Sequence, residues 1–455
     1  MAEKKESNGK MEKIISLAKR RGFVYQGSEI YGGLAGTWDY GPLGVTLKNN
    51  LKALWWKRFV EDREDMYGVD AALLMNPRVW EASGHVAGFS DPLVEDAKTH
   101  KRYRADHLLE DAGHSTKGLS LDQMGALIQE KKLKSPDGNA LGPVRQFNMM
   151  FKTHIGPVQD DSSISYLRPE TAGGIFVNFK NVLDSFHPKL PFGIAQIGKA
   201  FRNEIAPRDF IFRLRELEQM EIEYFVRPAD WEKHFEEFRL AVIQWTKDIG
   251  LRQVHELEIA DADRAHYSKR TIDFEFDFPF GRKELYGLAY RTDFDLKSHS
   301  EASGADLSYY DEATKERFIP HVIEPSFGVD RTVLAVLSDA YSEDELSGET
   351  RTFLRLAPVI APIKAAVFPL LKNKPELVAK AREVHAMLRK EIGAVAFDDN
   401  GNIGKRYRRQ DEIGTPWCIT VDFDTLTDGA VTVRDRDTGK QERVSIATLA
   451  QKIRI

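Results

Sequence analysis

The chain contains 455 residues, of which 42% are hydrophobic and 30% are charged, and its formal net charge is −5. This length suits about three domains, and a mean hydropathy of −0.42 without a long apolar run excludes a membrane-spanning helix. The negative charge gives no general attraction to nucleic acid, so a polyanionic partner would need a local basic patch. The single cysteine, Cys418, excludes an internal disulfide framework and indicates a reducing, cytoplasmic location.

The first eighty residues predict a tail, two helices and a strand. Residues 1–10 are charged and contain no apolar segment, so we expect a disordered tail and not a signal peptide. Residues 11–21 have helical apolar spacing, and Gly22 suits a helix end. Residues 45–60 carry a strong apolar stripe, which predicts an amphipathic helix. Residues 66–80 are typical of a strand that runs into the segment MNPRVW.

Residues 90–160 differ from their surroundings because they are charged, rich in glycine and poor in β-branched residues. Ser120 and Gln123 are spaced as a capping box before a helix. We therefore expect an insertion with its own small helical fold. After it, the segment 272–280 alternates strictly and further segments are typical of strands. The middle of the chain thus predicts an antiparallel sheet with helices, an α+β fold.

The stretch AFRNEIAPRDFIFRLRELEQMEIEYF, residues 200–225, alternates from Phe212 onward. Successive side chains of a strand point to opposite faces. One parity is mostly apolar, and the other carries polar groups of both signs: Arg213, Arg215, Gln219, Glu221 and Glu223, together with Leu217. A half-buried strand would place this polar row in water, whereas a binding site would use it. The strand alone leaves both interpretations open.

Past Pro358 the pattern changes, because buried strands alternate with helices over about a hundred residues. This predicts a separate α/β domain over residues 357–455. It contains a basic cluster in the segment GKRYRRQ, whose charged members are Lys405, Arg406, Arg408 and Arg409. Cys418 lies in an apolar strand of this region, so it is no candidate nucleophile.

The usual nucleophile, P-loop and dinucleotide-binding motifs are missing from the sequence. His154-Ile155-Gly156-Pro157 is similar to the HIGH motif of class I aminoacyl-tRNA synthetases, but no KMSKS-like partner follows. Three other stretches occur in a meaningful order: Pro77 after the helix and strand of residues 45–76, the Phe-Arg-x-Glu pattern with Arg202 and Glu204, and EPSFGVDR before an apolar helix. In this order they resemble motifs 1, 2 and 3 of class II aminoacyl-tRNA synthetases.

Longer strings resemble the dimeric bacterial and eukaryotic type of glycyl-tRNA synthetase, among them RPETAGGIFVNF, FRLRELEQMEIEYF, RTDFDL, EPSFGVDR and IGKRYRRQDEIGTP. This resemblance runs from about residue 20 to the end. It implies a six- or seven-stranded antiparallel catalytic sheet within residues 11–356, a helical insertion at 90–160 and a C-terminal α/β anticodon-binding domain at 357–455. The implied function is ATP-dependent attachment of glycine to tRNA(Gly) through a glycyl-adenylate, with Mg²⁺, by a homodimer that has no membrane partner.

The resemblance also implies site residues. Activation joins two anions, a carboxylate and ATP, so the site needs arginines, which bind both bidentately. The implied catalytic residues are Arg202, for the α-phosphate and the carboxylate, and Arg331, for adenine or the γ-phosphate. The implied ATP-binding residues are Arg202, Asn203, Glu204, Phe212, Arg213, Leu214, Arg215, Glu216, Leu217, Glu284, Leu285, Gly328, Val329, Asp330 and Arg331. Arg213 and Arg215 would reach the outer phosphates, Glu204 would accept the adenine amino group, and Glu284 would bind Mg²⁺.

The glycine site should bind an ammonium and a carboxylate and should sterically exclude larger side chains, so that no editing domain is needed. Glu170, Glu221 and Glu324 would bind the ammonium, with Ser326 nearby. The implied substrate-binding residues are Arg104, Glu170, Leu217, Glu218, Gln219, Met220, Glu221, Arg291, Glu324, Pro325, Ser326, Phe327 and Gly328. Glu284 and Arg291 differ in strand parity, so we expect a bulge between them, near Tyr286 and Gly287.

The resemblance extends to partners. The stripe of Leu47, Leu51, Leu54 and Trp55 would pack across the two-fold axis of the dimer; burial within one subunit is the alternative. Lys405, Arg406, Arg408 and Arg409 would contact tRNA phosphates. Acceptors for the cytosine amino groups of the anticodon would come from nearby acidic residues: Asp411, Glu412 and Asp422.

The sequence departs from the family at three points. Leu217 replaces a phenylalanine that forms one side of the adenine site, and Gly173 replaces a glutamine, which we expect to loosen a loop beside the glycine site. Cysteine pairs that suit zinc in some relatives are missing, and His100 and His114 alone cannot build a tetrahedral site, so we predict no structural zinc.

Two other functions compete with the ligase. One is a catalytically inactive, synthetase-like nucleic-acid-binding protein, similar to accessory subunits of organellar DNA polymerases; it should have lost Arg202, Arg331 or the carboxylates. The other is a class II relative specific for another small amino acid, which should lack the surroundings RPETAGG and EPSFG.

Overall fold

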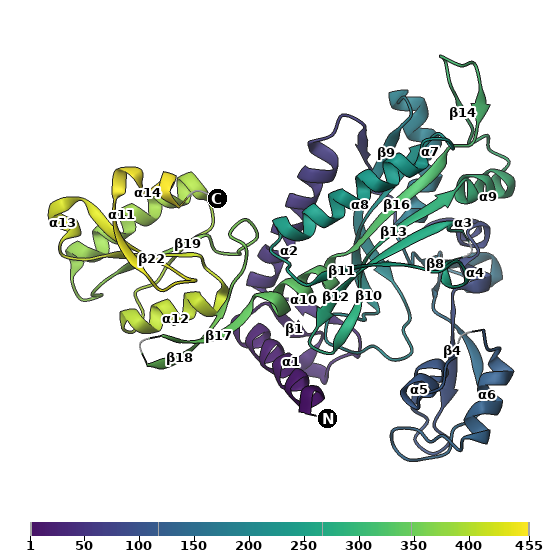
Figure 1. The fold of residues 1–455 in the computed structure, drawn as a ribbon, viewed down its shortest axis with the longest axis horizontal. Coiled ribbons are helices and arrows are strands. Elements are labelled where there is room, and N and C mark those ends of the chain that lie inside the picture. Colours follow the sequence, from purple (N-terminus) through teal and green to yellow (C-terminus); the bar gives the residue numbers. More distant parts are fainter. Residues whose placement is uncertain (1, 117, 266, 347, 454–455) are drawn as a thin grey trace.

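The computed structural model describes residues 2–116, 118–265, 267–346 and 348–453. A seven-stranded sheet forms the centre of its larger part (Figure 1). Neighbouring strands are antiparallel except for the pair β9 and β3 at one edge. In spatial order the strands are β11 (Val254–Glu258), β12 (Arg270–Phe278), β13 (Gly281–Thr292), β16 (His321–Gly328), β10 (Glu216–Val226), β9 (Phe192–Phe201) and β3 (Met66–Gly68). The predicted α+β core with an antiparallel sheet is confirmed.

Helices cover both faces of this sheet (Figure 1). One face packs against α2 (Pro42–Trp56), α8 (Trp231–Asp248) and α10 (Val329–Ala340). The other face packs against α7 (Ala172–Phe186) and α9 (Phe294–Ser303). The two sides of β10 therefore belong to different cores: Met220 and Ile222 join the first, and Phe225 joins the second.

The apolar stripe of α2 is buried inside this chain. Leu47, Leu51 and Trp55 have no exposed surface and belong to the same core as the sheet. The Trp55 ring lies 5.8 Å from that of Phe327 in β16. The prediction that this stripe packs across a dimer axis is therefore wrong, because the sheet of its own subunit already removes it from water. The helix continues as a π-helical turn, Lys57–Glu61.

The N-terminal elements differ from the prediction in two places. Helix α1 (Ala2–Arg21) includes residues 2–10, where the sequence predicts a disordered tail, and its segment AEKKE consists of good helix formers. Residue 1 lies outside the described residues. The helix ends before Gly22, whose φ of 76° favours glycine. The strand expected over 66–80 is only β3. Asn76 instead caps a helix that Pro77 begins, α3 (Pro77–Ala82).

The insertion is a mixed domain and not a helical one. Its three-stranded antiparallel sheet consists of β4 (Ser90–Glu95), β5 (Arg102–Arg104) and β6 (Arg145–Asn148), with helices α5 (Ala105–Asp111) and α6 (Leu121–Glu130). Val94, Leu109 and Ile128 form part of a separate small core. The short β-strands were missed because they are polar and partly exposed. The capping box of Ser120 and Gln123 is confirmed at the start of α6.

The C-terminal part is a separate α/β unit with its own core (Figure 1). Its strand order is β20 (Val395–Phe397), β19 (Ala365–Pro369), β21 (Trp417–Val421), β22 (Ala430–Asp435) and β23 (Gln441–Ser445). Strand β19 is parallel to β20 and β21, and the remaining pairs are antiparallel. The helices are α11 (Pro375–Ile392), α12 (Ile403–Ile413), α13 (Thr425–Asp428) and α14 (Ile446–Lys452). The predicted α/β domain is confirmed.

Smaller elements connect these units. They are β1 (Val24–Gln26), β2 (Trp38–Tyr40), α4 (His85–Gly88), β7 (Phe151–His154), β8 (Ile164–Leu167), β14 (Tyr309–Tyr310), β15 (Arg317–Phe318), β17 (Tyr341–Leu346), β18 (Glu349–Leu354) and the 3₁₀ turns Glu29–Tyr31, Asp161–Ser163 and Asp261–Asp263. None of the helices in the described ranges combines the length and apolar composition needed to cross a membrane.

Candidate active site

The polar row of β10 is buried and does not face water. Gln219, Glu221 and Glu223 are 7%, 2% and 0% exposed. They lie on the face of the sheet opposite to Met220 and Ile222, which enter the apolar core. The strand begins at Glu216 and not at Phe212, because Arg208–Arg215 form a turn in which Asp209 and Phe210 have positive φ. Of the two interpretations of this stretch, the binding site is the one that fits.

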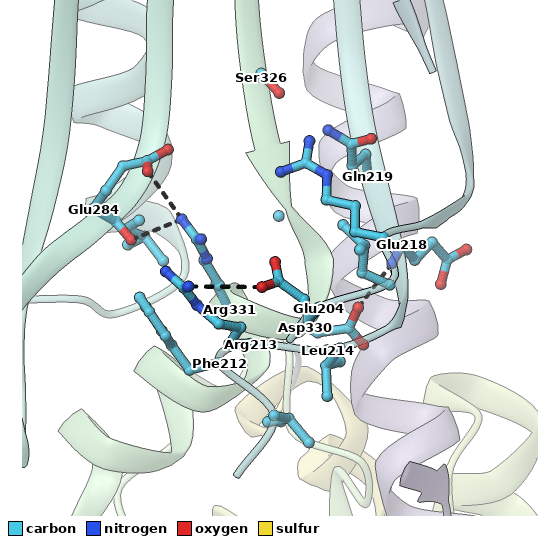
Figure 2. A pocket seen from close by; sticks show the side chains of 15 residues that line it. Glu204, Phe212, Arg213, Leu214, Glu218, Gln219, Glu284, Ser326, Asp330 and Arg331 are labelled. Atoms are coloured by element: carbon cyan, nitrogen blue, oxygen red, sulfur yellow. Dashed lines mark hydrogen bonds and ion pairs between the residues drawn. The ribbon is translucent and has the colours of Figure 1, made fainter. Parts of the chain in front are cut away.

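A first cavity of about 150 Å³ lies where β10, β13 and β16 meet the start of α10 (Figure 2). Most predicted ATP-binding residues line it: Arg202, Glu204, Phe212, Arg213, Leu214, Leu217, Glu284, Leu285, Gly328, Asp330 and Arg331. Two residues predicted for the substrate, Glu218 and Gln219, also line it. Ser326 closes the cavity on the side of β16 (Figure 2).

Two arginines present cationic groups to this cavity. The Arg331 guanidinium lies over the Phe212 ring, 4.5 Å from its centroid, and its Nη1 is 3.2 Å from Glu284 Oε2. The Arg213 Nη1 is 3.6 Å from Glu204 Oε2 (Figure 2). Among the described residues, that Glu204 oxygen is buried and accepts no hydrogen bond. A buried acceptor without a donor beside arginines suits a ligand that brings both a donor and anionic groups.

Arg202 lies at the junction of two cavities. It lines the first one and also a second cavity of about 370 Å³, with Gln219, Glu284 and Ser326 likewise shared. Its Nε donates to the Pro169 carbonyl at 3.0 Å, and its guanidinium lies 5.5 Å from the centroid of the Phe89 ring. These contacts orient the side chain without neutralising it.

The second cavity is acidic. Glu170, Glu221 and Glu324 line it together with Ser326 and Gln219. Ser326 Oγ donates to Glu221 at 2.8 Å, and Thr171 Oγ1 donates to the other oxygen of that carboxylate. His85 Nε2 is 3.3 Å from Glu170.

The carboxyl groups of this cavity differ in acidity. Burial alone would raise the pKa of Glu170, but the charges of His85, Arg291 and Arg202 outweigh it and lower the pKa to about 2. Burial, followed by the charge of Glu170, raises the pKa of Glu221. Glu170 is therefore a fixed negative charge at neutral pH.

Arg291 does not line either cavity, and its role as a substrate contact stays a prediction. Its guanidinium is 3% exposed, binds Asp295 bidentately with both distances at 2.7 Å, and donates to Glu324 Oε2 at 2.9 Å. It therefore neutralises and orients the acidic side chains behind the second cavity. The predicted role of Arg104 likewise stays a prediction. Arg104 lies in the insertion, where Asp91 at 2.7 Å and Asp106 bind it, and it lines neither cavity.

Other predicted residues also lie outside both cavities. Met220, Pro325 and Phe327 have the parity that faces the opposite side of the sheet, and Val329 is buried in the same core. Arg215 donates to the carbonyls of Ala35 and Glu204, so the outer-phosphate role is not supported. Asn203 N bonds the Met149 carbonyl, and Glu216 pairs with Lys199. These residues share a motif with site residues but not their orientation.

The predicted bulge between Glu284 and Arg291 is present. Phe274 pairs with Tyr286 and Glu275 pairs with Glu284, so Leu285 has no partner in β12. The bulge thus precedes Tyr286 by one residue. It changes the parity of β13, so that Glu284 and Gly287 both line the second cavity. Against β16 the register shifts again at Arg291.

A buried network that the sequence did not reveal supports the first cavity. Asp330 accepts hydrogen bonds from Tyr40 Oη at 2.6 Å and from the Glu218 backbone N at 2.8 Å. Lys48 Nζ lies 2.7 Å from Glu218 and 3.3 Å from Asp330. The only signal was a lysine between Leu47 and Leu51 on the apolar stripe. Because protein groups satisfy the Asp330 carboxylate, it positions β10 and α10.

Gly173 lies within α7 and not in a loosened loop, so that expectation is wrong. A Cβ atom at this position would lie 2.8 Å from Cζ3 of the buried Trp80. Trp80 occupies the space that a larger residue would need, and the region is closely packed.

The basic cluster of α12 divides into buried and exposed members. Arg406 is 1% exposed and donates to the carbonyls of Pro369, Asp399 and Gly401, so its predicted contact with tRNA is wrong. Lys405 and Arg408 are exposed, and Arg409 is 2.6 Å from Asp398. Their location on one exposed helix is compatible with the prediction.

The acidic residues proposed to recognise cytosine already have protein partners. Asp411 is 1% exposed and binds Arg434 at 2.8 and 2.9 Å, which contradicts that role. Glu412 pairs with Arg21 of α1, and Asp422 is 2.6 Å from Arg443. Sequence proximity to the basic cluster did not indicate these partners.

No group of three or more His, Cys, Asp or Glu side chains in the described ranges is arranged to hold a metal ion. His100 Nδ1 is 2.9 Å from Glu95. The absence of structural zinc stays a prediction.

Family comparisons agree with the two-part architecture. Residues 151–340 match the tRNA synthetase class II core domain (G, H, P, S and T), and residues 364–454 match an anticodon binding domain. The fold is also similar to that of Giardia lamblia prolyl-tRNA synthetase in complex with prolyl-adenylate, with a TM-score of 0.70 over 98% of this chain and 75% of that chain. At 16% identity this likeness concerns the fold alone. Fold and cavities together define a class II aminoacyl-tRNA synthetase.

Curated relatives narrow the family. The chain is 54% identical to the glycine–tRNA ligase of Lachnospira eligens, over 96% of this chain and 97% of that protein. It is 52% identical to the glycine–tRNA ligases of Macrococcus caseolyticus and Caldanaerobacter subterraneus, over 96% of both chains in each case. The chain therefore belongs to the glycine–tRNA ligase family.

Proposed function

We propose that this protein attaches glycine to tRNA(Gly) with ATP, through an enzyme-bound glycyl-adenylate. The observation that carries this function is the pair of adjoining cavities with opposite chemistry. One presents Arg213 and Arg331, the other presents Glu170, Glu221 and Glu324, and Arg202 lies between them. An inactive relic would have no reason to keep this arrangement, so we favour the enzyme.

In the first step a carboxylate oxygen of glycine attacks the α-phosphorus of ATP, and the bond to the bridging oxygen of the leaving pyrophosphate breaks. The nucleophile is already ionised, so no protein base is required. The chain supplies positions and positive charge. Arg202, located between the cavities, would hold both the carboxylate and the α-phosphate. Arg213 and Arg331 would hold the outer phosphates and the adenine ring, and Glu204 would accept from the adenine amino group.

Mg²⁺ is implied by the family, and the chain offers a suitable ligand. Glu284 lies at the first cavity, and the side chain is half exposed. Mg²⁺ bound with a nucleotide uses one or two carboxylates and the phosphates, so Glu284 would hold it there. Bound in this way, the ion neutralises phosphate charge.

The acidic cavity would select the amino acid. Its carboxylates attract an ammonium group, and the hydrogen bond from Ser326 fixes Glu221 in place. Gly287 contributes no side chain to the wall. The exclusion of larger amino acids is part of this proposal.

The C-terminal domain would bind the anticodon stem-loop. Lys405, Arg408 and Arg409 lie on α12, where they would contact phosphates and position the loop without specifying its bases.

A homodimer in the cytoplasm completes the proposal. Because the α2 stripe is buried, the dimer contact needs another apolar surface. Ile30, Tyr31 and Leu34 supply one, since they are 89%, 87% and 56% exposed within one short loop. We expect sedimentation at micromolar concentration to show a dimer, and Ile30→Ser with Tyr31→Ser to shift it toward monomer. A wild-type monomer would contradict this part.

Exchange of labelled pyrophosphate into ATP tests the chemistry. Across a panel of amino acids, we expect only glycine to support exchange. Arg202→Ala should abolish it, because removing a preorganised charged group costs about 3 kcal/mol or more. Arg208→Ala is the matched control, since Arg208 lies in the same loop but lines neither cavity. Exchange that persists in Arg202→Ala would defeat the assignment.

A further inference from the structure

Two glutamates of the central sheet face each other across neighbouring strands. Glu221 pairs with Ser326, and Tyr224 pairs with Ile323, in the antiparallel ladder of β10 and β16. The same register places Glu223 opposite Glu324. Directly opposite side chains have Cβ atoms about 5 Å apart, and like charges in such positions repel. Both residues are buried, at 0% and 8% exposure.

Within the described part of the chain, Glu223 has no hydrogen-bonding partner. Neither of its carboxyl oxygens accepts a hydrogen bond from a described residue. On β9 it pairs with the apolar Ile194, and the buried residues of α7 are all apolar or small. The charged groups that act on its pKa are Glu324 on β16, Arg291 on β13, Glu221 on its own strand and Asp295 on α9. Three of these four groups are acidic.

Among the described residues, Arg291 is the cation that acts on Glu223, and it is already bound. Arg291 binds Asp295 bidentately through Nε and Nη2, and its Nη1 donates to Glu324 at 2.9 Å. If both opposed glutamates were ionised, Glu223 would be a buried charge without solvation or partner, which is strongly unfavourable. A proton on Glu223 removes that charge and gives the carboxyl group a donor. The acceptor on the residue opposite it in the ladder is Glu324.

We propose that Glu223 is protonated at neutral pH and donates a hydrogen bond to Glu324, so that Glu324 carries the charge of the pair into the acidic cavity. Glu223 is thereby a positioning residue for the amino-acid site. Arg291 decides which member is charged, because it bonds Glu324 and not Glu223. This part of the role rests on the proposed function, since Glu324 is one of the groups assigned to the glycine ammonium.

The pKa of Glu223 agrees with this assignment, whereas that of Glu324, taken alone, would leave Glu324 largely protonated at pH 7. We assign the charge to Glu324 because Arg291 donates to it at 2.9 Å. Burial, followed by the charge of Glu324, raises the pKa of Glu223 well above its usual value. Burial also raises the pKa of Glu324 to about 8, although Arg291 opposes the shift. The pair therefore holds at least one proton near neutral pH. Two opposed carboxyl groups that share a proton are a known way to accommodate such a pair.

Infrared spectroscopy of the full-length protein tests the protonation directly. The difference spectrum of wild type minus Glu223→Gln near neutral pH should contain the carbonyl band of a protonated carboxylic acid. The matched control is wild type minus Glu170→Gln, which should lack this band because Glu170 has a pKa of about 2. A Glu223 difference spectrum that shows only carboxylate bands would overturn the proposal.

The pH dependence of unfolding gives a second measurement. A carboxyl group whose folded pKa is raised stabilises the fold fully below its unfolded pKa, and this contribution is lost as pH rises toward the folded pKa. In Glu223→Gln this side chain cannot titrate, so the variant lacks this one pH-dependent contribution to stability. Relative to Glu223→Gln, the unfolding equilibrium constant of the wild type should therefore rise about tenfold per pH unit above about pH 5. A ratio that does not change with pH would overturn the proposal.

Kinetics test the positioning role. Glu223→Gln keeps a donor for Glu324 and should leave the KM for glycine within about twofold of wild type. Glu223→Leu has a similar volume without the donor and should raise that KM about tenfold, with the KM for ATP unchanged. Equal glycine KM values in the two folded variants would refute this role. If wild type failed to use glycine at all, the proposed function would fail, whereas the spectroscopic and unfolding results would still decide the protonation.

Discussion

Arginines are concentrated in two regions of this chain, the central cavities and helix α12, and the protein provides them with very different partners. In the central region, Arg202, Arg213 and Arg331 line a cavity, and the carboxylates near Arg213 and Arg331 lie at 3.2–3.6 Å. In α12, Arg406 is buried and donates to backbone carbonyls. Both sets look alike in sequence. The difference shows that an arginine is available to a ligand only where the fold leaves its donors incompletely used.

Arg331 provides the largest expected effect. Its guanidinium lies over Phe212 and faces the first cavity, so Arg331→Ala should remove a preorganised cation from the nucleotide site. We expect glycine-dependent pyrophosphate exchange to lose about 3–4 kcal/mol of transition-state stabilisation, roughly a hundredfold to a thousandfold in rate. The measurement is kcat/KM for exchange, with Arg208→Ala as control. If Arg331→Ala exchanged pyrophosphate at the wild-type rate, the arginines of the central cavity would not differ in function from those of α12.

Substitution of Arg406 should have the opposite effect: it should lower the stability of the C-terminal domain and leave the activation of glycine unchanged. Arg406→Met leaves the carbonyls of Pro369, Asp399 and Gly401 without their donor inside the C-terminal domain. We expect a loss of about 3 kcal/mol in the unfolding free energy of that domain. Calorimetry should show its transition at lower temperature, while pyrophosphate exchange is unchanged.

The control for this change is Arg408→Met, on the exposed side of the same helix. Exposed ion pairs contribute little, so its effect should stay within about 0.5 kcal/mol. Equal destabilisation by both substitutions would contradict the division of α12 into a buried and an exposed side.

The sequence predicted the sheet and the C-terminal domain, because alternation and apolar periodicity are local properties, whereas most of the nucleotide cavity was implied by the family resemblance. It also predicted the bulge near Tyr286, since Glu284 and Arg291 had to share a face. Predictions that placed every residue of a motif in the site were less successful. Met220, Pro325 and Phe327 share motifs with cavity residues but face the core. A motif identifies a strand, whereas parity decides which of its residues can touch a ligand.

The remaining errors concern partners that are distant in sequence. Arg291 contacts Glu324 on another strand, and Asp411 contacts Arg434, which also lies in another element. The buried Lys48 meets Glu218 and Asp330, which lie about 170 and 280 positions away in the chain. No periodicity of a single segment contains such information. It appears only after the sheet and the helices have been assembled.

Leu217 allows a gain of function to be tested within the central region. It lines the first cavity and is partly exposed, at a position where the family resemblance implies an aromatic ring beside adenine. Leu217→Phe should restore a stacking contact of about 1 kcal/mol, which is roughly a fivefold lower KM for ATP. The KM for glycine should not change. Leu217→Met serves as control, and an ATP KM that Leu217→Phe leaves unaltered would place the nucleotide base elsewhere.

The smallest expected effects concern the exposed side of α12. Lys405 and Arg408 are exposed there, although Glu349 pairs with Arg408, and Asp398 binds the less exposed Arg409 at 2.6 Å. If the exposed pair contacts tRNA phosphates, each substitution to alanine should make the salt dependence of tRNA affinity shallower by about one counterion. Arg443→Ala is the matched control, because Asp422 and Asp428 already bind that arginine. Filter binding of tRNA(Gly) across a salt series measures the slopes, and pyrophosphate exchange should stay at the wild-type rate in all three variants. An equal change of slope in Arg443→Ala would mean that α12 is not the tRNA contact. It would also mean that the protein partners of an arginine do not predict whether it binds tRNA in this domain.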